Sequence, residues 1–188
     1  MQSLNFEYFI MSKKIVLIGY MGTGKSSIGK KLADKLNIPF IDLDEYISLK
    51  ESSAISTIFE TKGILYFRKK EREYLNELLN NKDDFILATG GGTPCYYDNI
   101  KQINNYGISI LINTPLNILV NRLATNKDSR PLISHLKDEE LTEFIAKHLF
   151  ERNNYYHKAQ LIVNNANSIE ETATSIEKAL KEITSFEA

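Results

Sequence analysis

Residues 19–26, GYMGTGKS, decide the fold class of this chain. Their spacing is G-x-x-x-x-G-K-S, and they stand directly after an apolar run, residues 14–18, and at the start of an amphipathic stretch, residues 25–36. A strand before this spacing and a helix after it are the context of a phosphate-binding loop. The alternative is a glycine turn with an incidental lysine, which these flanks disfavour. We therefore expect residues 19–26, here called the phosphate loop, to bind ATP or GTP.

The residue types of the phosphate loop suit a triphosphate. Glycines allow positive φ values that turn successive N–H groups toward the β-phosphate, and the helix that follows adds its positive end. We expect Lys25 to bridge the β- and γ-phosphates and the Ser26 hydroxyl to bind Mg²⁺. The predicted ATP contacts of this loop are Gly22, Thr23, Gly24, Lys25, Ser26 and Ser27.

Outward from the loop, short β-rich runs alternate with longer amphipathic stretches, which is the pattern of a parallel sheet covered by helices. The pattern predicts strands at residues 14–18, 39–41, 85–88, 108–112 and 161–163. It predicts helices at residues 25–36, 44–50, 53–61, 64–80, 115–125, 139–158 and 168–184. The polar segment 126–138 is expected to be a mobile loop inside one domain that covers residues 13–188.

Composition favours a single soluble domain. Of 188 residues, 43% are hydrophobic and 25% charged, and the net charge of -1 gives no overall field that would attract nucleic acid or an anionic membrane. The apolar runs are far shorter than the ~18 residues of a membrane span. A single cysteine, Cys95, fits a reducing cytoplasm. Residues 1–12 are interpreted as an N-terminal extension without a secretory signal, with Met11 as the native start.

Two acids close the second predicted strand, and an arginine follows them in the chain. Asp42 and Asp44 would lie on one face of that strand, where they could serve a metal ion and a hydroxyl. The alternative is that one of them caps the next helix, which explains one acid and not both. Arg68 stands beside Phe67, so partial burial and a role in binding an anion are expected, whereas Arg72 is interpreted as part of an exposed i,i+3 or i,i+4 charge pair.

A second group of candidates follows the third predicted strand. Glycines occupy residues 90–92, at the carboxyl end of that strand, where open α/β sheets bind ligands. Close approach of a ligand to bare backbone and a simple wide turn explain these glycines equally well. Arg130 lies in segment 126–138 and Arg152 late in the next predicted helix. Loop arginines are usually solvated, but a cation on a closing loop can neutralise transition-state charge.

Taken together, these motifs resemble those of the shikimate kinases, small relatives of the nucleoside monophosphate kinases. The resemblance rests on the order and spacing of GYMGTGKS, FIDLD, FRKKE, TGGG, RPL and Arg152 four residues before Tyr156. It implies a three-layer α/β/α fold with a five-stranded parallel sheet and a lid, about residues 126–138. It also implies transfer of the γ-phosphoryl group of ATP to the 3-hydroxyl of shikimate, a step of chorismate and aromatic amino-acid biosynthesis.

The resemblance also assigns residues to roles. Lys25, Asp44 and Arg130 would be catalytic, and Arg122 and Arg130 would join the phosphate loop in binding ATP. Ser26 and Asp42 would serve Mg²⁺. The residues implied for the acceptor are Asp44 at its hydroxyls, Gly90, Gly91 and Gly92 at its ring, and Arg68 and Arg152 at its carboxylate. A cytoplasmic monomer, with no nucleic-acid or membrane partner, is expected. Beside adenine, where the family commonly has an acid and basic residues, this chain has NNANS at 164–168.

Three other functions compete with this interpretation. A gluconate-type sugar-acid kinase would share the phosphate loop but not the later motifs, and a nucleoside monophosphate kinase would need a base-recognition region that residues 47–62 do not provide. A non-catalytic ATP-binding module would have no reason for the acid pair and the arginines. None of the three histidines, His135, His148 and His157, is given a role beyond surface or helix positions, and Cys95 is interpreted as a packed thiol.

Overall fold

The phosphate loop follows the central strand of a five-stranded parallel sheet. The computed structural model describes residues 14–127, 130, 132–165 and 168–185, so the predicted extension and the Met11 start lie outside the described residues. The strands are β1 (Lys14–Ile18), β2 (Phe40–Asp42), β3 (Phe85–Ala88), β4 (Ile108–Asn113) and β5 (Leu161–Asn164). Their order is β2-β3-β1-β4-β5, and every pairing is parallel. This confirms the predicted sheet.

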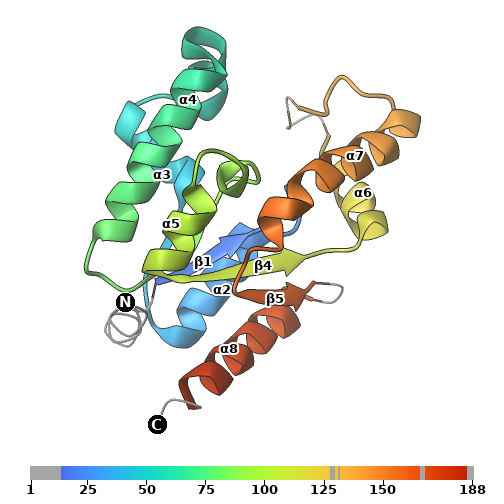
Figure 1. Cartoon of the computed structure of the whole chain (residues 1–188). Helices are drawn as coiled ribbons and strands as arrows, with labels where there is room; N and C mark the ends of the chain where they lie inside the picture. The colour runs from blue at the N-terminus through green and yellow to red at the C-terminus, as the bar shows by residue number, and fades with distance from the viewer. Residues whose placement is uncertain (1–13, 128–129, 131, 166–167, 186–188) are drawn as a thin grey trace.

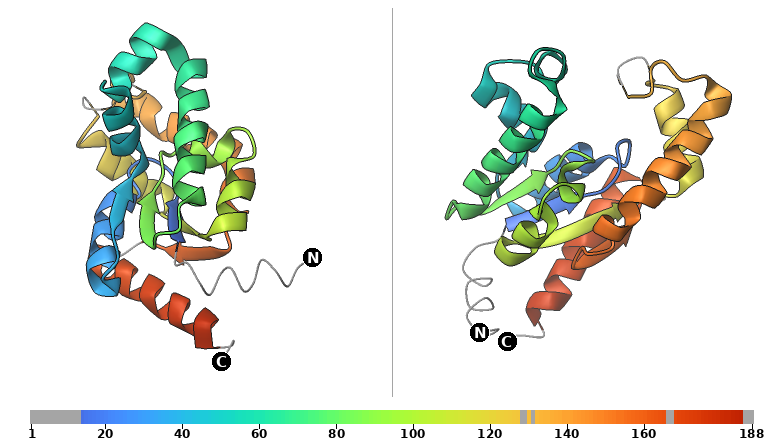
Figure 2. Two further views of the ribbon diagram at one scale, coloured as in Figure 1. Left: turned by 90° about the vertical axis from the view of Figure 1, so that its left-hand side faces the viewer. Right: turned by 45° about the horizontal axis from the view of Figure 1, so that its top comes forward.

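The helices are α2 (Lys25–Leu36), α3 (Leu43–Glu51), α4 (Ile55–Asn80), α5 (Asn99–Tyr106), α6 (Leu116–Ala124), α7 (Asp138–Tyr156) and α8 (Ile169–Ser185). A short 3₁₀ helix, η1, spans Thr93–Cys95. Figure 1 shows α2 and α8 below the sheet and the other helices above it, and the second view in Figure 2 agrees.

Alternation along the strands explains why both faces are covered. Successive side chains of a strand point to opposite faces. Ile15 and Leu17 of β1 therefore join a core cluster with α2 and α8, while Val16 and Ile18 join a larger cluster with α3 to α7. All five residues of β1 are buried, as expected for a central strand in a three-layer fold.

The fold departs from the predicted elements in a few places. The strand predicted at 39–41 is displaced by one residue because Pro39 lacks an N–H, although its carbonyl accepts a hydrogen bond from Ile86 N at 2.8 Å. α5 was not predicted, because its polar sequence offers only Ile100 and Ile103 to the core. The break predicted between residues 61 and 64 is confirmed, since Gly63 interrupts α4 with a φ of 78°.

Two groups of helices stand apart from each other on one face of the sheet. α3 and α4 stand on one side and α6 and α7 on the other (Figure 1). Among the described residues, no helix is both long enough and apolar enough to cross a membrane.

Candidate active site

The phosphate loop is held in a conformation that only glycine adopts easily. Gly22 and Gly24 have φ values of 81° and 86°, in the left-handed region. Lys25 Nζ donates hydrogen bonds of 2.8 Å to the carbonyl oxygens of both Gly19 and Tyr20, so the ammonium group lies across the loop. Burial lowers the pKa of Lys25 to about 8. A phosphate bound in the loop would favour the charged form of this lysine.

The two predicted acids lie on different elements. β2 ends at Asp42, and Asp44 lies in the first turn of α3, so the prediction that both share one face of a strand is wrong. The Asp42 carboxylate caps α3 by accepting from the N–H groups of Asp44 (3.0 Å) and Glu45 (3.4 Å). It also accepts a 2.6 Å hydrogen bond from the Ser26 hydroxyl. One acid therefore has the capping role, and it also joins β2 to the phosphate loop.

The carboxylate of Asp44 has no hydrogen-bond donor among the residues that the structure describes. Burial, followed by the neighbouring charges of Asp42 and Glu71, raises the pKa of Asp44 to about 6. A carboxylate in this state is poised to change its protonation near neutral pH, which is a property of groups that orient or receive protons in reactions.

A cavity of about 690 Å³ collects the residues predicted for the acceptor and the lid. They are one aspartate, three glycines and three arginines. They come from α3, α4, α7, the turn after β3 and segment 126–138. These residues are Asp44, Arg68, Gly90, Gly91, Gly92, Arg130 and Arg152. Apolar side chains complete the wall: Met21, Ile55, Phe59, Ile64, Phe67 and Leu132. Apolar walls with a few convergent polar groups are typical of a small-molecule site.

Arg68 is fixed in the cavity wall by a buried ion pair. Its Nη1 donates to Glu71 Oε2 at 2.7 Å, and the Glu71 side chain is fully buried. The guanidinium also lies over the Tyr96 ring, 4.1 Å from its centroid. The second oxygen of Glu71 accepts a 2.6 Å bond from the Thr93 hydroxyl. The guanidinium is therefore oriented before any ligand arrives.

The three glycines are explained by the side chains around them. A Cβ atom at Gly92 would lie 2.5 Å from Arg68 Nη2, and one at Gly90 would lie 3.2 Å from Asp44 Oδ1. A Cβ atom at Gly91 would lie 3.2 Å from Met21 N in the phosphate loop. The turn is bare because polar side chains and a second loop approach it closely. The Tyr156 hydroxyl donates to Gly91 O at 2.6 Å and ties the end of α7 to the same turn.

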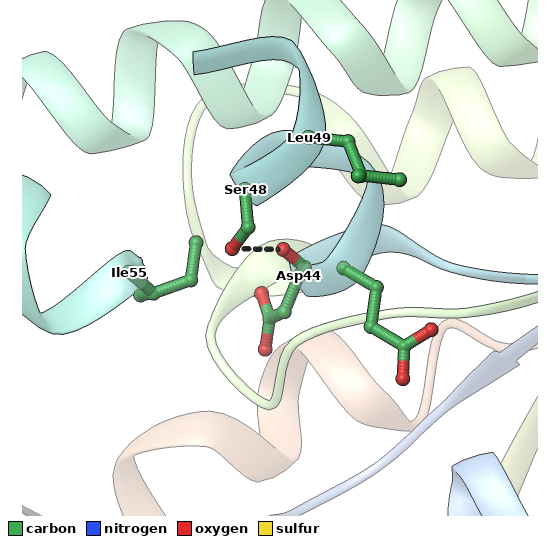
Figure 3. A pocket seen from close by; sticks show the side chains of 5 residues that line it. Asp44, Ser48, Leu49 and Ile55 are labelled. Atoms are coloured by element: carbon green, nitrogen blue, oxygen red, sulfur yellow. Dashed lines mark hydrogen bonds between the residues drawn. The ribbon is translucent and has the colours of Figure 1, made fainter. Parts of the chain in front are cut away.

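A second hollow, of about 460 Å³, lies on the α3 side of Asp44 and is lined by Asp44, Glu45, Ser48, Leu49 and Ile55. Figure 3 shows four of these side chains labelled, with Ser48 Oγ donating to the Asp44 carbonyl oxygen at 2.9 Å. Because this bond uses the carbonyl group, it leaves the Asp44 carboxylate available. Arginines are absent from the lining of this hollow, so the 690 Å³ cavity is the better candidate for an anionic ligand.

Two predicted ATP contacts lie away from this cavity. Arg122 lies against the phosphate loop, where its Nη1 donates to Gly22 O at 3.4 Å. Ser27 is exposed in the first turn of α2. Their places beside the loop are compatible with the predicted contacts, which stay predictions.

Segment 126–138 contains an apolar anchor that its polar composition did not suggest. Ile133 is fully buried in the larger core cluster, and Leu136 packs against the same cluster. Lys127 Nζ donates to Leu136 O at 2.9 Å. The polar composition of this segment therefore did not reveal the buried side chain of Ile133, whereas the expected mobility of the segment stays a prediction.

Sequence reasoning missed several side chains that shape the site. Glu71 belongs to the FRKKE motif, three residues after Arg68, and that spacing could have identified it as a partner of the arginine. His148 lies in a helix, as predicted, but it also lines the cavity, which the sequence did not indicate, while His135 and His157 are exposed as expected. Asn165 donates to Thr23 O at 2.5 Å from behind the phosphate loop. Nothing in the sequence pattern signalled that contact.

Cys95 and Arg72 lie outside the proposed chemistry of the site. Burial raises the pKa of the Cys95 thiol to about 11, in agreement with a packed thiol. Arg72 pairs with Asp98 at 2.7 Å, so the prediction of an i,i+3 or i,i+4 partner on its own helix is wrong; the partner comes from the turn before α5.

Comparison with known proteins identifies one family. A family model described as shikimate kinase matches residues 21–184. A curated shikimate kinase of Flavobacterium psychrophilum is 50% identical over 145 residues, 77% of this chain and 84% of the relative. A crystal structure of shikimate kinase from Bacteroides thetaiotaomicron superposes with a TM-score of 0.84 at 36% identity and covers 90% of this chain and 98% of that one. Shikimate kinase from Acinetobacter baumannii, solved in complex with shikimate, has a TM-score of 0.81 at 30% identity and covers 94% and 97%.

The raised pKa of Asp44 predicts a pH-dependent cost in stability. The pKa is about 6 in the folded protein and 3.8 in the reference state, so the folded state disfavours ionisation. Ionised Asp44 therefore lowers stability above pH 6, and the cost disappears toward pH 4 as both states become protonated. Asp44→Asn should raise the free energy of unfolding at pH 7.5 by about 1 to 3 kcal/mol, and by less at pH 5.

Urea unfolding of both proteins at the two pH values measures this difference. Glu45→Gln, at the exposed neighbouring position, is the matched control and should change stability little. Equal stabilities of wild type and Asp44→Asn at pH 7.5 would contradict the assignment.

Proposed function

This chain belongs to the shikimate kinase family, and from that premise we propose which of its residues perform each part of the reaction. The enzyme transfers the γ-phosphoryl group of ATP to a hydroxyl of shikimate, the 3-hydroxyl, and gives shikimate 3-phosphate and ADP. This reaction is a step of chorismate and aromatic amino-acid biosynthesis. The observation that supports the assignment of residues is the convergence of Asp44, Arg68, Arg130 and Arg152 on one cavity beside the phosphate loop.

The phosphates of ATP would be bound by the phosphate loop, with Gly22, Thr23, Gly24 and Ser27 contributing backbone or hydroxyl groups. Arg122, which contacts Gly22 O, would lie beside the nucleotide. Lys25 would leave the carbonyl groups of Gly19 and Tyr20 for the β- and γ-phosphates. Opposite charge is a better partner than a peptide carbonyl, so this exchange favours nucleotide binding.

Ser26 and Asp42 fit Mg²⁺, since the ion prefers hard oxygen ligands and is usually held by one or two protein groups together with substrate phosphates. Their hydroxyl and carboxylate oxygens are 2.6 Å apart at the edge of the phosphate loop. When bound, Mg²⁺ would neutralise charge on the phosphates. Capping of α3 by the other oxygen of Asp42 would keep the carboxylate in place.

Shikimate would occupy the 690 Å³ cavity with its carboxylate between Arg68 and Arg152. The planar guanidinium group suits a carboxylate because it offers two parallel N–H donors. Asp44 would hold the acceptor hydroxyls, and Gly90, Gly91 and Gly92 would let the ring approach the backbone. The apolar wall, including Phe59 and Phe67, would pack against the carbon atoms of the ring.

In the transfer step the acceptor oxygen would attack the γ-phosphorus, the bond from the γ-phosphorus to the bridging oxygen would break, and ADP would leave. Asp44 would orient the hydroxyl and receive its proton, which its raised pKa favours. Lys25 and Arg130 would neutralise the charge that develops on the transferring group. Closure of residues 126–138 would bring Arg130 to the phosphate and exclude water.

We also propose that residues 13–188 act as one domain in a cytoplasmic monomer, without nucleic-acid or membrane partners. The single cysteine, the net charge of -1 and the ATP requirement support this setting.

The proposed assignment is tested first by the choice of acceptor. With ATP and Mg²⁺, phosphorylation should occur with shikimate and not with gluconate, AMP or CMP, in a coupled assay of ADP release. Asp44→Asn should lower turnover with shikimate by ~10²-fold or more while ATP binding persists, because the charge that orients the hydroxyl is lost. Near-normal turnover of this variant would show that Asp44 has no role in the mechanism. Preference for gluconate would show that shikimate is not the acceptor.

The grip on the carboxylate is tested by substitutions that keep the charge. Arg68→Lys and Arg152→Lys lose the bidentate geometry, so each should raise the KM for shikimate by about 10-fold or more, with the KM for ATP changed far less. Arg72→Lys, whose arginine pairs with Asp98 on the surface, is the matched control. Wild-type KM values in both cavity variants would show that these arginines do not bind the acceptor.

The lid role of Arg130 predicts a loss in rate more than in binding. Arg130→Ala should lower kcat by ~10²-fold or more and weaken shikimate binding little, because its best contact forms in the transition state. Hydrogen exchange of the amides in 126–138 should be fast in the free protein and slow with ADP and shikimate together. Unchanged exchange, with a defect confined to KM, would mean that this segment is a static wall.

A further inference from the structure

We propose that His148 is a further acceptor-binding residue, which donates the hydrogen of its Nε2 to an oxygen of bound shikimate. The proposal rests on the assignment of the 690 Å³ cavity to the acceptor. His148 lies in α7 and lines that cavity together with Arg152, one helical turn further along. Residues four apart lie on one face of a helix, so both side chains approach the ligand from the same side.

The imidazole ring is held in place on two sides. Its Nδ1 lies 2.9 Å from the Tyr20 hydroxyl, and the two rings meet edge to face with centroids 5.5 Å apart. On its own helix, Phe144 contacts the same ring at a centroid distance of 5.3 Å. These contacts leave the ring one orientation relative to the cavity, so its free nitrogen is positioned before shikimate binds.

The hydrogen bond to Tyr20 fixes which nitrogen carries the hydrogen. Tyr20 is almost fully buried, and burial raises the pKa of its hydroxyl to about 12, so the group is a neutral phenol. Among the described residues its hydrogen has no acceptor other than His148 Nδ1. A buried donor is rarely left unpaired, so the phenol donates to Nδ1. The hydrogen of the neutral imidazole then resides on Nε2.

The imidazole remains neutral over the working range of pH. Burial, and then the charge of Arg152, lower the pKa of His148 to about 4. Nε2 has no hydrogen-bond partner among the described residues, and His148 is one of the residues that line the 690 Å³ cavity. The neutral N–H group of His148 would supply a directional hydrogen bond beside the positive charge of Arg152. This pair of groups suits a cyclic acid that carries both a carboxylate and hydroxyl groups.

Tyr20 belongs to the phosphate loop, so the hydrogen bond from Tyr20 also connects His148 to the ATP side of the site. A purely structural role, in which His148 serves only as a partner for Tyr20, is the competing explanation. The two explanations use different ring nitrogens. Substitutions of His148 that keep a polar group at the position of only one ring nitrogen can therefore distinguish the two explanations.

The experiment compares His148→Asn with His148→Gln. The amide of asparagine reaches the place of Nδ1 and keeps a partner for Tyr20, whereas the amide of glutamine reaches the place of Nε2 and keeps the donor to shikimate. We expect His148→Asn to raise the KM for shikimate by about 5- to 10-fold, with the KM for ATP within about twofold. His148→Gln should recover most of that loss. His157→Asn, at an exposed position at the end of the same helix, is the matched control.

A direct readout on the unaltered enzyme accompanies the variants. In protein labelled with ¹⁵N-histidine, the Nε2 resonance of His148 should shift when shikimate is added and stay in place with ADP alone. The proposal is overturned if this resonance ignores shikimate, or if His148→Asn binds shikimate better than His148→Gln. It is also overturned if both variants match wild type, or if both raise the two KM values equally.

Arg152→Lys separates this proposal from the assignment of the cavity. If Arg152→Lys raises the KM for shikimate and His148→Asn does not, only the role of His148 is wrong. If Arg152→Lys has no effect, the carboxylate grip is wrong, and the Nε2 resonance still reports whether shikimate contacts His148.

Discussion

The buried carboxylate of Glu71 is the interaction on which the acceptor side of this molecule depends. It binds the Arg68 guanidinium through one oxygen and the Thr93 hydroxyl through the other, and so joins α4 to the turn after β3. Its charge also contributes to the raised pKa of Asp44. Removing one partner of a buried pair leaves a charge without compensation and commonly costs about 3 to 5 kcal/mol. The cation that faces the ligand is therefore balanced by a carboxylate whose two oxygens already bind Arg68 and Thr93.

The nucleotide side is held by a different set of polar contacts. Asn165, which follows β5, donates to Thr23 O at 2.5 Å, and its own N–H donates to Asn113 O at 2.7 Å. The Thr172 hydroxyl of α8 donates to Asn165 Oδ1 at 3.1 Å. The phosphate loop is thus braced by β4, β5 and α8, while its front remains available to phosphate. Such bracing lets backbone N–H groups keep their direction when charge arrives.

The sequence predicted the parts of the site whose signal is local. The phosphate loop is one continuous motif, and the strands around it have apolar runs that match a buried parallel sheet. Asp44, Arg68 and Arg152 were found because their motifs occur in a known order. Contacts between distant segments left no such signal: the bond between Tyr20 and His148 joins residues 128 positions apart. Ile133 was missed because one apolar residue in a polar segment has no periodicity.

The hydrogen bond from Tyr156 to Gly91 O has a mechanical consequence. It fastens the carboxyl-terminal end of α7 to the glycine turn, while the amino-terminal end of this 19-residue helix adjoins segment 126–138. A helix of that length is about 28 Å long and nearly rigid, so any tilt of α7 would have its pivot near Tyr156. A tilt would move Arg152, one turn from the pivot, only slightly and the far end much more. Arg152 could therefore keep its position at the acceptor while the amino-terminal end of α7 moves.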